Sequence, residues 1–102
     1  MPALPDQLPP DAKLVELRPE FLAFDTRACM LPGTHLSLRL VMEEHPLALD
    51  VEVSQCLVVD KDKKGYLYRA RILLSQIPAG DRHLIKLFIA KGRGAARLLP
   101  GA

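Results

Sequence analysis

Two adjacent glutamates followed by a histidine form a dense group of acid–base side chains. Glu43 and Glu44 stand directly before His45 and Pro46. Paired carboxylates beside an imidazole are residue types that general acid–base catalysis uses. The same residues are also typical of a solvated turn, because the glutamates are charged and proline cannot donate a backbone hydrogen bond. Strand-like segments lie on both sides, so the sequence favours the turn.

The histidines and cysteines lack the spacing of a metal site. His35, His45 and His83 share no close spacing with one another or with Cys29 and Cys56. Zinc ligands, by contrast, usually occur in pairs that only two to five residues separate. We therefore predict no catalytic residues, no metal and no cofactor, and expect that the chain is not an enzyme.

Charge is distributed unevenly along the chain, although the formal net charge is only +2. Residues 1–60 hold ten acidic and four basic side chains, whereas residues 61–102 hold ten basic and two acidic ones. The negative charge of the first part and the positive charge of the second largely cancel if both lie side by side in one domain. The alternative is a basic surface that binds an acidic protein partner. Its candidate residues are Arg82, Lys86, Lys91, Arg93 and Arg97.

Nucleic acid is a weaker alternative as the partner of this basic surface. Proteins that bind single strands usually combine basic residues with aromatic side chains that stack on bases. Aromatic residues make up only 5% of this chain, and tryptophan is absent. We therefore expect a protein partner.

The most regular local pattern predicts a β-hairpin, with strands near residues 47–59 and 65–75, followed by a helix over 81–91. Apolar side chains alternate with polar ones from Leu47 to Ser54, which indicates a strand with one buried face. In the second strand, Tyr66, Tyr68, Ala70, Ile72 and Leu74 fall on alternate positions. Apolar residues then change to helical spacing. Leu84 and Phe88 lie one turn apart and are expected to face the strands.

The predicted helix also has recognisable ends. Asp81 is a candidate N-cap, because its carboxylate can accept a hydrogen bond from a free amide of the first turn. Gly92 is a candidate C-terminal stop, because glycine adopts the left-handed conformation that commonly ends a helix. The period changes from two to about 3.6 residues once along this part of the chain.

This order of elements, together with two motifs, resembles the C-terminal part of a PilZ domain. Residues 31–40 (LPGTHLSLRL) have the family's Leu-Pro-Gly-x-x-Leu-x-Leu pattern at the start of a middle strand. Residues 80–89 (GDRHLIKLFI) are similar to the family's closing helix. The resemblance covers roughly residues 13–91. It implies a small bacterial antiparallel β-barrel, or split barrel, of about five or six strands with one C-terminal α-helix.

The ligand motifs of that family are absent. Members that bind cyclic di-GMP carry Arg-x-x-x-Arg near the N-terminus and Asp/Asn-x-Ser-x-x-Gly on the next strand. Glu16, Arg18 and Phe21 stand at the positions of the second motif, and no arginine precedes them. We therefore expect a degenerate nucleotide site in a regulatory or adaptor domain that binds another protein. The alternative is a cyclic di-GMP receptor whose arginines come from a dimer partner or from Arg18, Arg69 or Arg71.

The chain is predicted to form one small domain, over residues 12–91, with two flexible ends. Prolines concentrated in the first ten residues favour an extended arm over residues 1–11. Glycines without a sustained apolar pattern favour a flexible basic tail over residues 92–102. No segment has the pattern of a signal peptide or a membrane span, so we expect a cytoplasmic location. The first three strands are expected near residues 13–18, 20–26 and 34–43.

Overall fold

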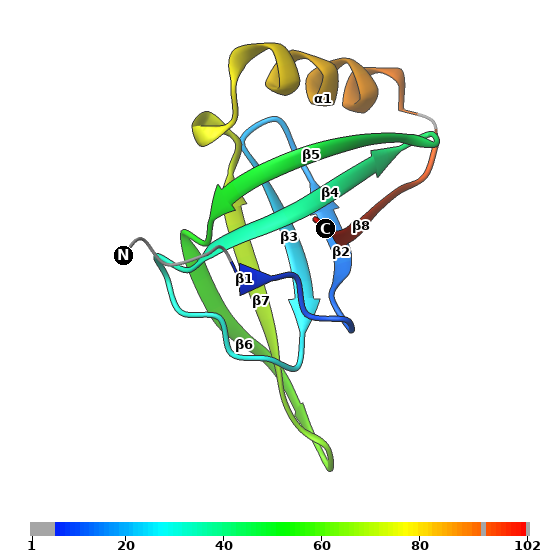
Figure 1. The fold of residues 1–102 in the computed structure, drawn as a ribbon. Coiled ribbons are helices and arrows are strands. Elements are labelled where there is room, and N and C mark those ends of the chain that lie inside the picture. Colours follow the sequence, from blue (N-terminus) through cyan, green and yellow to red (C-terminus); the bar gives the residue numbers. More distant parts are fainter. Residues whose placement is uncertain (1–5, 93, 102) are drawn as a thin grey trace.

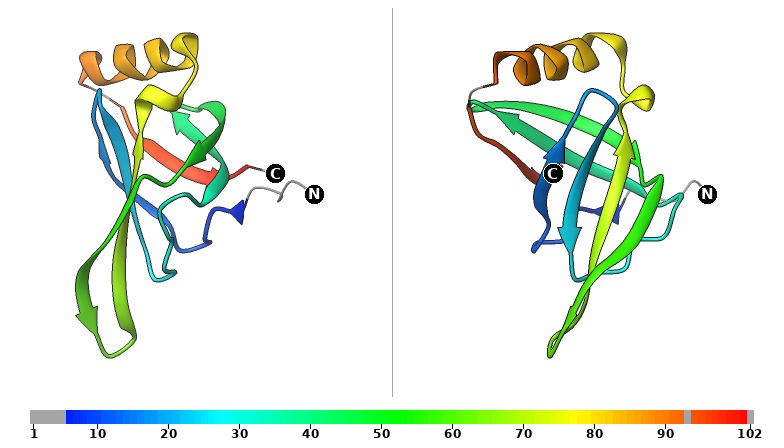
Figure 2. Two further views of the ribbon diagram at one scale, coloured as in Figure 1. Left: turned by 90° about the vertical axis from the view of Figure 1, so that its left-hand side faces the viewer. Right: turned by 180° about the vertical axis from the view of Figure 1, so that it is seen from behind.

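The structure, a computed structural model, describes residues 6–92 and 94–101 and is mainly β (Figure 1). Two four-stranded sheets face each other, and one helix lies across one end of them (Figure 2). Sheet A contains β1 (Asp6–Gln7), β4 (His35–Met42), β5 (His45–Glu52) and β8 (Ala96–Pro100). Sheet B contains β2 (Lys13–Leu17), β3 (Phe21–Thr26), β6 (Gln55–Asp62) and β7 (Gly65–Leu73). A short 3-10 helix, η1 (Leu74–Gln76), precedes α1 (Ala79–Lys91).

The predicted class, mainly β with one helix, is confirmed, but the strand count is higher than expected. Strand β4 is central in sheet A, because β5 pairs with its whole length while β8 and the short parallel β1 share its other edge. The strand order in sheet B is β2-β3-β7-β6. In the described part of the chain, these strands form two sheets rather than a closed barrel.

The core lies between the sheets. Leu49, Val51 and Val53 are almost fully buried, and the polar residues between them are exposed, so the predicted alternation is confirmed. Burying such side chains contributes about 1.5–3 kcal/mol each. The largest side chains with less than 2% exposure are Phe24, Leu22, Leu36, Leu38, Leu40, Ile72, Leu74, Ile77 and Ile85.

The single strand predicted over residues 47–59 is wrong, because the chain leaves sheet A at Val53 and enters sheet B at Gln55. Backbone hydrogen bonds fix Val53 to the chain before β4. The side chain of Gln76 accepts a hydrogen bond from the Glu52 amide and donates one to the Glu52 carbonyl, both at 2.8 Å. These long-range contacts fix the position of the bend, which coincides with the end of the alternation at Ser54 and Gln55.

The helix is longer at its start than predicted. It begins at Ala79, and its N-cap is Pro78 rather than Asp81. The carbonyl of Pro78 accepts the first helical bond, from the amide of Arg82 at 2.9 Å. The predicted stop is confirmed, since Gly92 is the C-cap, with φ of 64°.

The buried face of α1 differs from the prediction. Ile85 is the fully buried residue of the helix, whereas Leu84 is 50% exposed, so its expected position facing the strands is wrong. Phe88 is partly buried against the core, as expected. Five of the six residues from 84 to 89 are apolar. Such a pattern does not identify which of them enters the core, because the apolar surface is wider than one stripe.

Both flexible ends predicted from the sequence contain ordered elements. In the N-terminal segment, β1 pairs with β4, and Leu8 is only 4% exposed. In the C-terminal segment, residues 96–100 form β8, which buries Leu98 to 8% exposure. These two strands extend the folded part of the chain beyond the predicted bounds of residues 12–91 at both ends. Residues 1–5, 93 and 102 lie outside the described residues.

Asp11 fastens the turn before β2 to the end of β3. Its carboxylate accepts hydrogen bonds from the Thr26 hydroxyl, at 2.6 Å, and from the Arg27 amide, at 2.8 Å. The Thr26 bond, followed by the Arg27 bond, lowers the pKa of Asp11 below its ordinary value. The stabilisation is therefore complete above the unfolded pKa of about 4 and is lost as pH falls through the lower, folded value.

We expect Asp11→Asn to flatten the acid end of the stability profile. The wild-type chain should lose thermal stability as pH falls from about 4 through the lower, folded pKa of Asp11, whereas the variant should start less stable and lose less over that range. Thermal unfolding at a series of pH values measures this difference. Asp50→Asn, at an exposed position of β5, is the control. Equal acid sensitivity of the wild type and Asp11→Asn would contradict this role of Asp11.

Candidate functional site

The outer face of sheet B brings together the residues that the sequence analysis named for a degenerate nucleotide site. Glu16 and Arg18 come from β2 and the turn after it, and Phe21 comes from the start of β3. Arg69 and Arg71 come from β7, where they pair in register with β3. All five residues named in the sequence analysis for this site therefore lie on three neighbouring strands or the turn joining them. They are neighbours because of the strand order, which their spacing in the sequence does not reveal.

Most of the charge on this face is already paired. Arg18 Nε donates to Glu16 Oε2 at 2.9 Å, and this bond is the main cause of the lowered pKa of Glu16. Arg69 donates two hydrogen bonds to Asp25, at 2.8 and 3.1 Å, which raise the pKa of Arg69. Two of the three candidate arginines are thus held by carboxylates that an anionic ligand must displace.

Arg71 has a different environment from the other two arginines. Its guanidinium carbon lies 4.1 Å from the centre of the Phe21 ring, a cation–π distance. Within the described ranges, Arg71 has no ion pair. The phenyl ring of Phe21 therefore covers one face of the Arg71 guanidinium.

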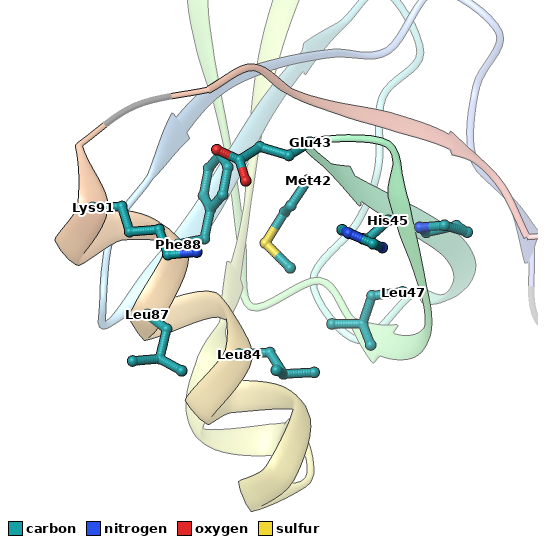
Figure 3. Close-up of a pocket in the computed structure, with 9 residues that line it drawn as sticks. Met42, Glu43, His45, Leu47, Leu84, Leu87, Phe88 and Lys91 are labelled. Atoms are coloured by element: carbon teal, nitrogen blue, oxygen red, sulfur yellow. The ribbon is translucent and has the colours of Figure 1, made fainter.

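A second candidate site is a groove between α1 and the hairpin of β4 and β5 (Figure 3). Its volume is about 400 Å³, within the usual range of ligand pockets. Leu84 on the helix and Leu47 on β5 lie on opposite sides of it (Figure 3). The apolar lining consists of Met42, Pro46, Leu47, Leu84, Leu87 and Phe88, and the polar lining consists of Glu43, His45 and Lys91.

The groove exists because the core uses only part of the apolar surface of α1. Ile85 is buried, and Phe88 and Ile89 pack partly against the core. Leu84 and Leu87 remain 50% and 47% exposed. Sequence reasoning assigned Leu84 to the core and did not identify the groove. The signal that was available is the excess of apolar residues on one short helix.

A strained turn closes one end of the groove. Glu43 and Glu44 connect β4 to β5 with φ of 49° and 70°, so the predicted hairpin turn is confirmed. Hairpin turns with two positive φ angles strongly prefer Asn-Gly. A non-glycine residue in this conformation costs roughly 1–2 kcal/mol. The glutamates therefore carry a local cost in stability.

Glu44→Gly is expected to stabilise the chain by about 0.5–1 kcal/mol. Glycine removes the steric cost of the positive φ, and its greater loss of backbone entropy offsets part of the gain. The variant also loses an exposed ion pair, of Glu44 with Arg97 at 3.6 Å, which is worth little. Thermal or urea unfolding measures the change. Glu20→Gly, at an exposed position between β2 and β3, is the control. If Glu44→Gly is less stable than the wild type, the backbone of Glu44 is not strained in the way proposed.

The basic residues predicted to bind a partner occupy two elements. Arg82, Lys86 and Lys91 lie on α1, Arg97 lies on β8, and Arg93 is outside the described residues. Lys91 lines the groove. Among the ion pairs of the described residues, none involves the three cations of α1. The helix therefore carries three cations outside these ion pairs, and Lys91 shares the lining of the groove with Glu43.

Within residues 6–92 and 94–101, no three histidine, cysteine, aspartate or glutamate side chains are grouped so that they could hold a metal ion. In the same part of the chain, no helix has the length and hydropathy needed to cross a membrane.

Comparison of the chain with protein-family models, with curated proteins and with solved structures finds no match. The resemblance to PilZ domains stays a prediction from the sequence.

Proposed function

We propose that this chain is a PilZ-like regulatory or adaptor domain that performs no catalysis and acts by binding another protein. The groove beside α1 is the observation that supports this proposal. It combines a concave apolar lining with two half-exposed leucines, Leu84 and Leu87, on one helix face. Exposed apolar surface gathered in one place is characteristic of binding sites, because burying the exposed half of each leucine contributes about 1 kcal/mol.

The charges beside the groove favour an acidic partner segment with apolar anchors. Helix α1 carries three cations and one acidic residue, Asp81. A partner with carboxylates flanking its apolar residues would complement this charge and associate faster. A second copy of the helix would bring like charges together. The groove therefore suits a different, acidic protein better than self-association.

The proposed adaptor does not use a nucleotide at the PilZ position. Charge-assisted hydrogen bonds contribute about 1.5–3 kcal/mol each, so two missing arginines remove about 3–6 kcal/mol of binding free energy. That loss changes a micromolar dissociation constant to about millimolar or weaker. Glu16 adds repulsion towards a dianion, and Phe21 occupies space that glycine leaves open.

A cyclic di-GMP receptor with non-standard contacts is the second candidate function. One observation favours it: Arg18, Arg69 and Arg71 all belong to the outer face of sheet B. Isothermal titration calorimetry separates the two functions. We expect no saturable heat at tens of micromolar cyclic di-GMP. A dissociation constant below about 10 μM, weakened by Arg71→Ala, would make the receptor the better proposal.

The groove is tested by partner capture followed by titration. Proteins retained by the immobilised chain are identified and purified, and each is titrated against the wild type, Leu87→Glu and Leu31→Glu. Leu31 is 69% exposed in the loop before β4 and serves as the control. We expect Leu87→Glu to weaken binding by about 30-fold or more, as for a residue worth 2 kcal/mol in an interface, and Leu31→Glu to have no effect. Equal affinities of all three chains would contradict the role of the groove.

A further inference from the structure

Strand β6 is an exposed edge of sheet B. In the described part of the chain it pairs with β7 alone, so its other edge has no strand partner. Figures 1 and 2 show the β6–β7 hairpin extending away from the rest of the molecule. Three consecutive apolar residues of β6, Leu57, Val58 and Val59, are 49%, 56% and 41% exposed. An edge of this composition is a template for pairing with another strand.

The edge of sheet A is protected by features that β6 lacks over most of its length. The exposed side chains of β5 include Pro46, Asp50 and Glu52. Proline lacks a backbone amide hydrogen that could pair with an added strand, and charged side chains on an edge strand disfavour the approach of a second strand. Residues 55–59 of β6 contain no charged residue and no proline.

We propose that β6 pairs with β6 of a second copy of this chain, antiparallel and across a two-fold axis at Leu57. Residues 55–59 form an uncharged segment whose centre is Leu57. This pairing places Cys56 opposite the partner's Val58 and Gln55 opposite the partner's Val59. Asp60 then lies opposite the partner's Ser54, so no two charges of the same sign face each other. A two-fold contact needs such a self-complementary surface.

The contact is short, and the dimer is correspondingly weak. The register of β6 on β7 shifts between Val58 and Asp60, which makes Val59 an extra residue of a bulge. A bulge bends an edge and limits pairing. We expect a dissociation constant of about 10–100 μM, as for protein–protein interfaces that bury little surface area.

The charge of residue 57 tests the two-fold contact. Leu57 lies opposite Arg69 on β7. The carboxylate of Leu57→Glu would therefore face an arginine of its own sheet, and the variant should remain folded. In the dimer, it places two carboxylates side by side. Sedimentation velocity over about 10 μM to 1 mM should show a dimer for the wild type and at least tenfold weaker association for Leu57→Glu. Val15→Glu, at a 37% exposed position of β2, the opposite edge strand of sheet B, is the control and should dimerise like the wild type.

A charge-swap mixture supplies the second readout. Leu57→Lys should also be monomeric, and mixing it with Leu57→Glu should restore a dimer, because opposite charges then meet at the axis. Circular dichroism checks that each variant is folded. A monomeric wild type at every concentration, a dimer unaffected by Leu57→Glu, or a mixture that stays monomeric would each overturn the proposal.

Discussion

A chain that ends at Ala95 is expected to be largely unfolded at room temperature. It lacks β8, whose five residues pair antiparallel with β4 from Leu38 to Met42. Loss of Leu98 from the core costs about 1.5–3 kcal/mol, and the exposed strand edge adds net hydrogen-bond losses of about 0.5–1.5 kcal/mol each. With about four such bonds along the five paired residues, the sum is about 3.5–9 kcal/mol, which is comparable to the whole stability of a small domain.

Urea unfolding of the truncated and complete chains measures this loss. Arg97→Ala is the matched control within the same strand, because this side chain is 59% exposed and its ion pair with Glu44 is on the surface. We expect that substitution to change stability by less than about 0.5 kcal/mol. A truncated chain within about 1 kcal/mol of the complete one would show that β8 contributes little, as the sequence pattern suggested.

The sequence missed β8 because the partner of that strand is distant. Arg97 lies opposite Val41, and no local periodicity reports a pairing over such a separation. The last residues also approach β4 too closely for a larger residue. A Cβ atom at Gly101 would meet the Ser37 side chain and lie 2.7 Å from its carbonyl carbon. In the sequence, the same glycine indicates only a flexible end.

Features that depend on local patterns were predicted well. The alternation from Leu49 to Val53, the turn at Glu43 and Glu44, and the helix stop at Gly92 each follow from neighbouring residues. The division of the predicted 47–59 strand between two sheets does not. Its bend is fixed by Gln76, a residue of η1, and the only local sign of it is that the alternation ends at Ser54 and Gln55, two consecutive polar residues.

The candidate sites show the same division between local and long-range information. Glu16 and Phe21 were identified from the motif positions, but the salt bridge of Arg69 with Asp25 depends on the register of β3 and β7. The groove depends on the rotation of α1 about its axis. That rotation is set by packing against the core, which the run of apolar residues from 84 to 89 leaves open.

Ile85→Ala is expected to destabilise the chain by about 2–5 kcal/mol, while Leu84→Ala should change stability by less than about 1 kcal/mol. Ile85 is fully buried, so its truncation leaves a cavity in the core. Leu84 is 50% exposed and loses little on truncation. Thermal and urea unfolding of the two variants measure the contrast directly.

The same pair of variants separates stability from binding. If the groove binds a partner, Leu84→Ala should weaken that binding while the chain stays folded, because Leu84 lines the groove without supporting the core. At a temperature where Ile85→Ala is still folded, it should bind the partner nearly as well as the wild type. Equal losses of stability in both variants would show that α1 is rotated by about one residue from the orientation described, and that Leu84 belongs to the core.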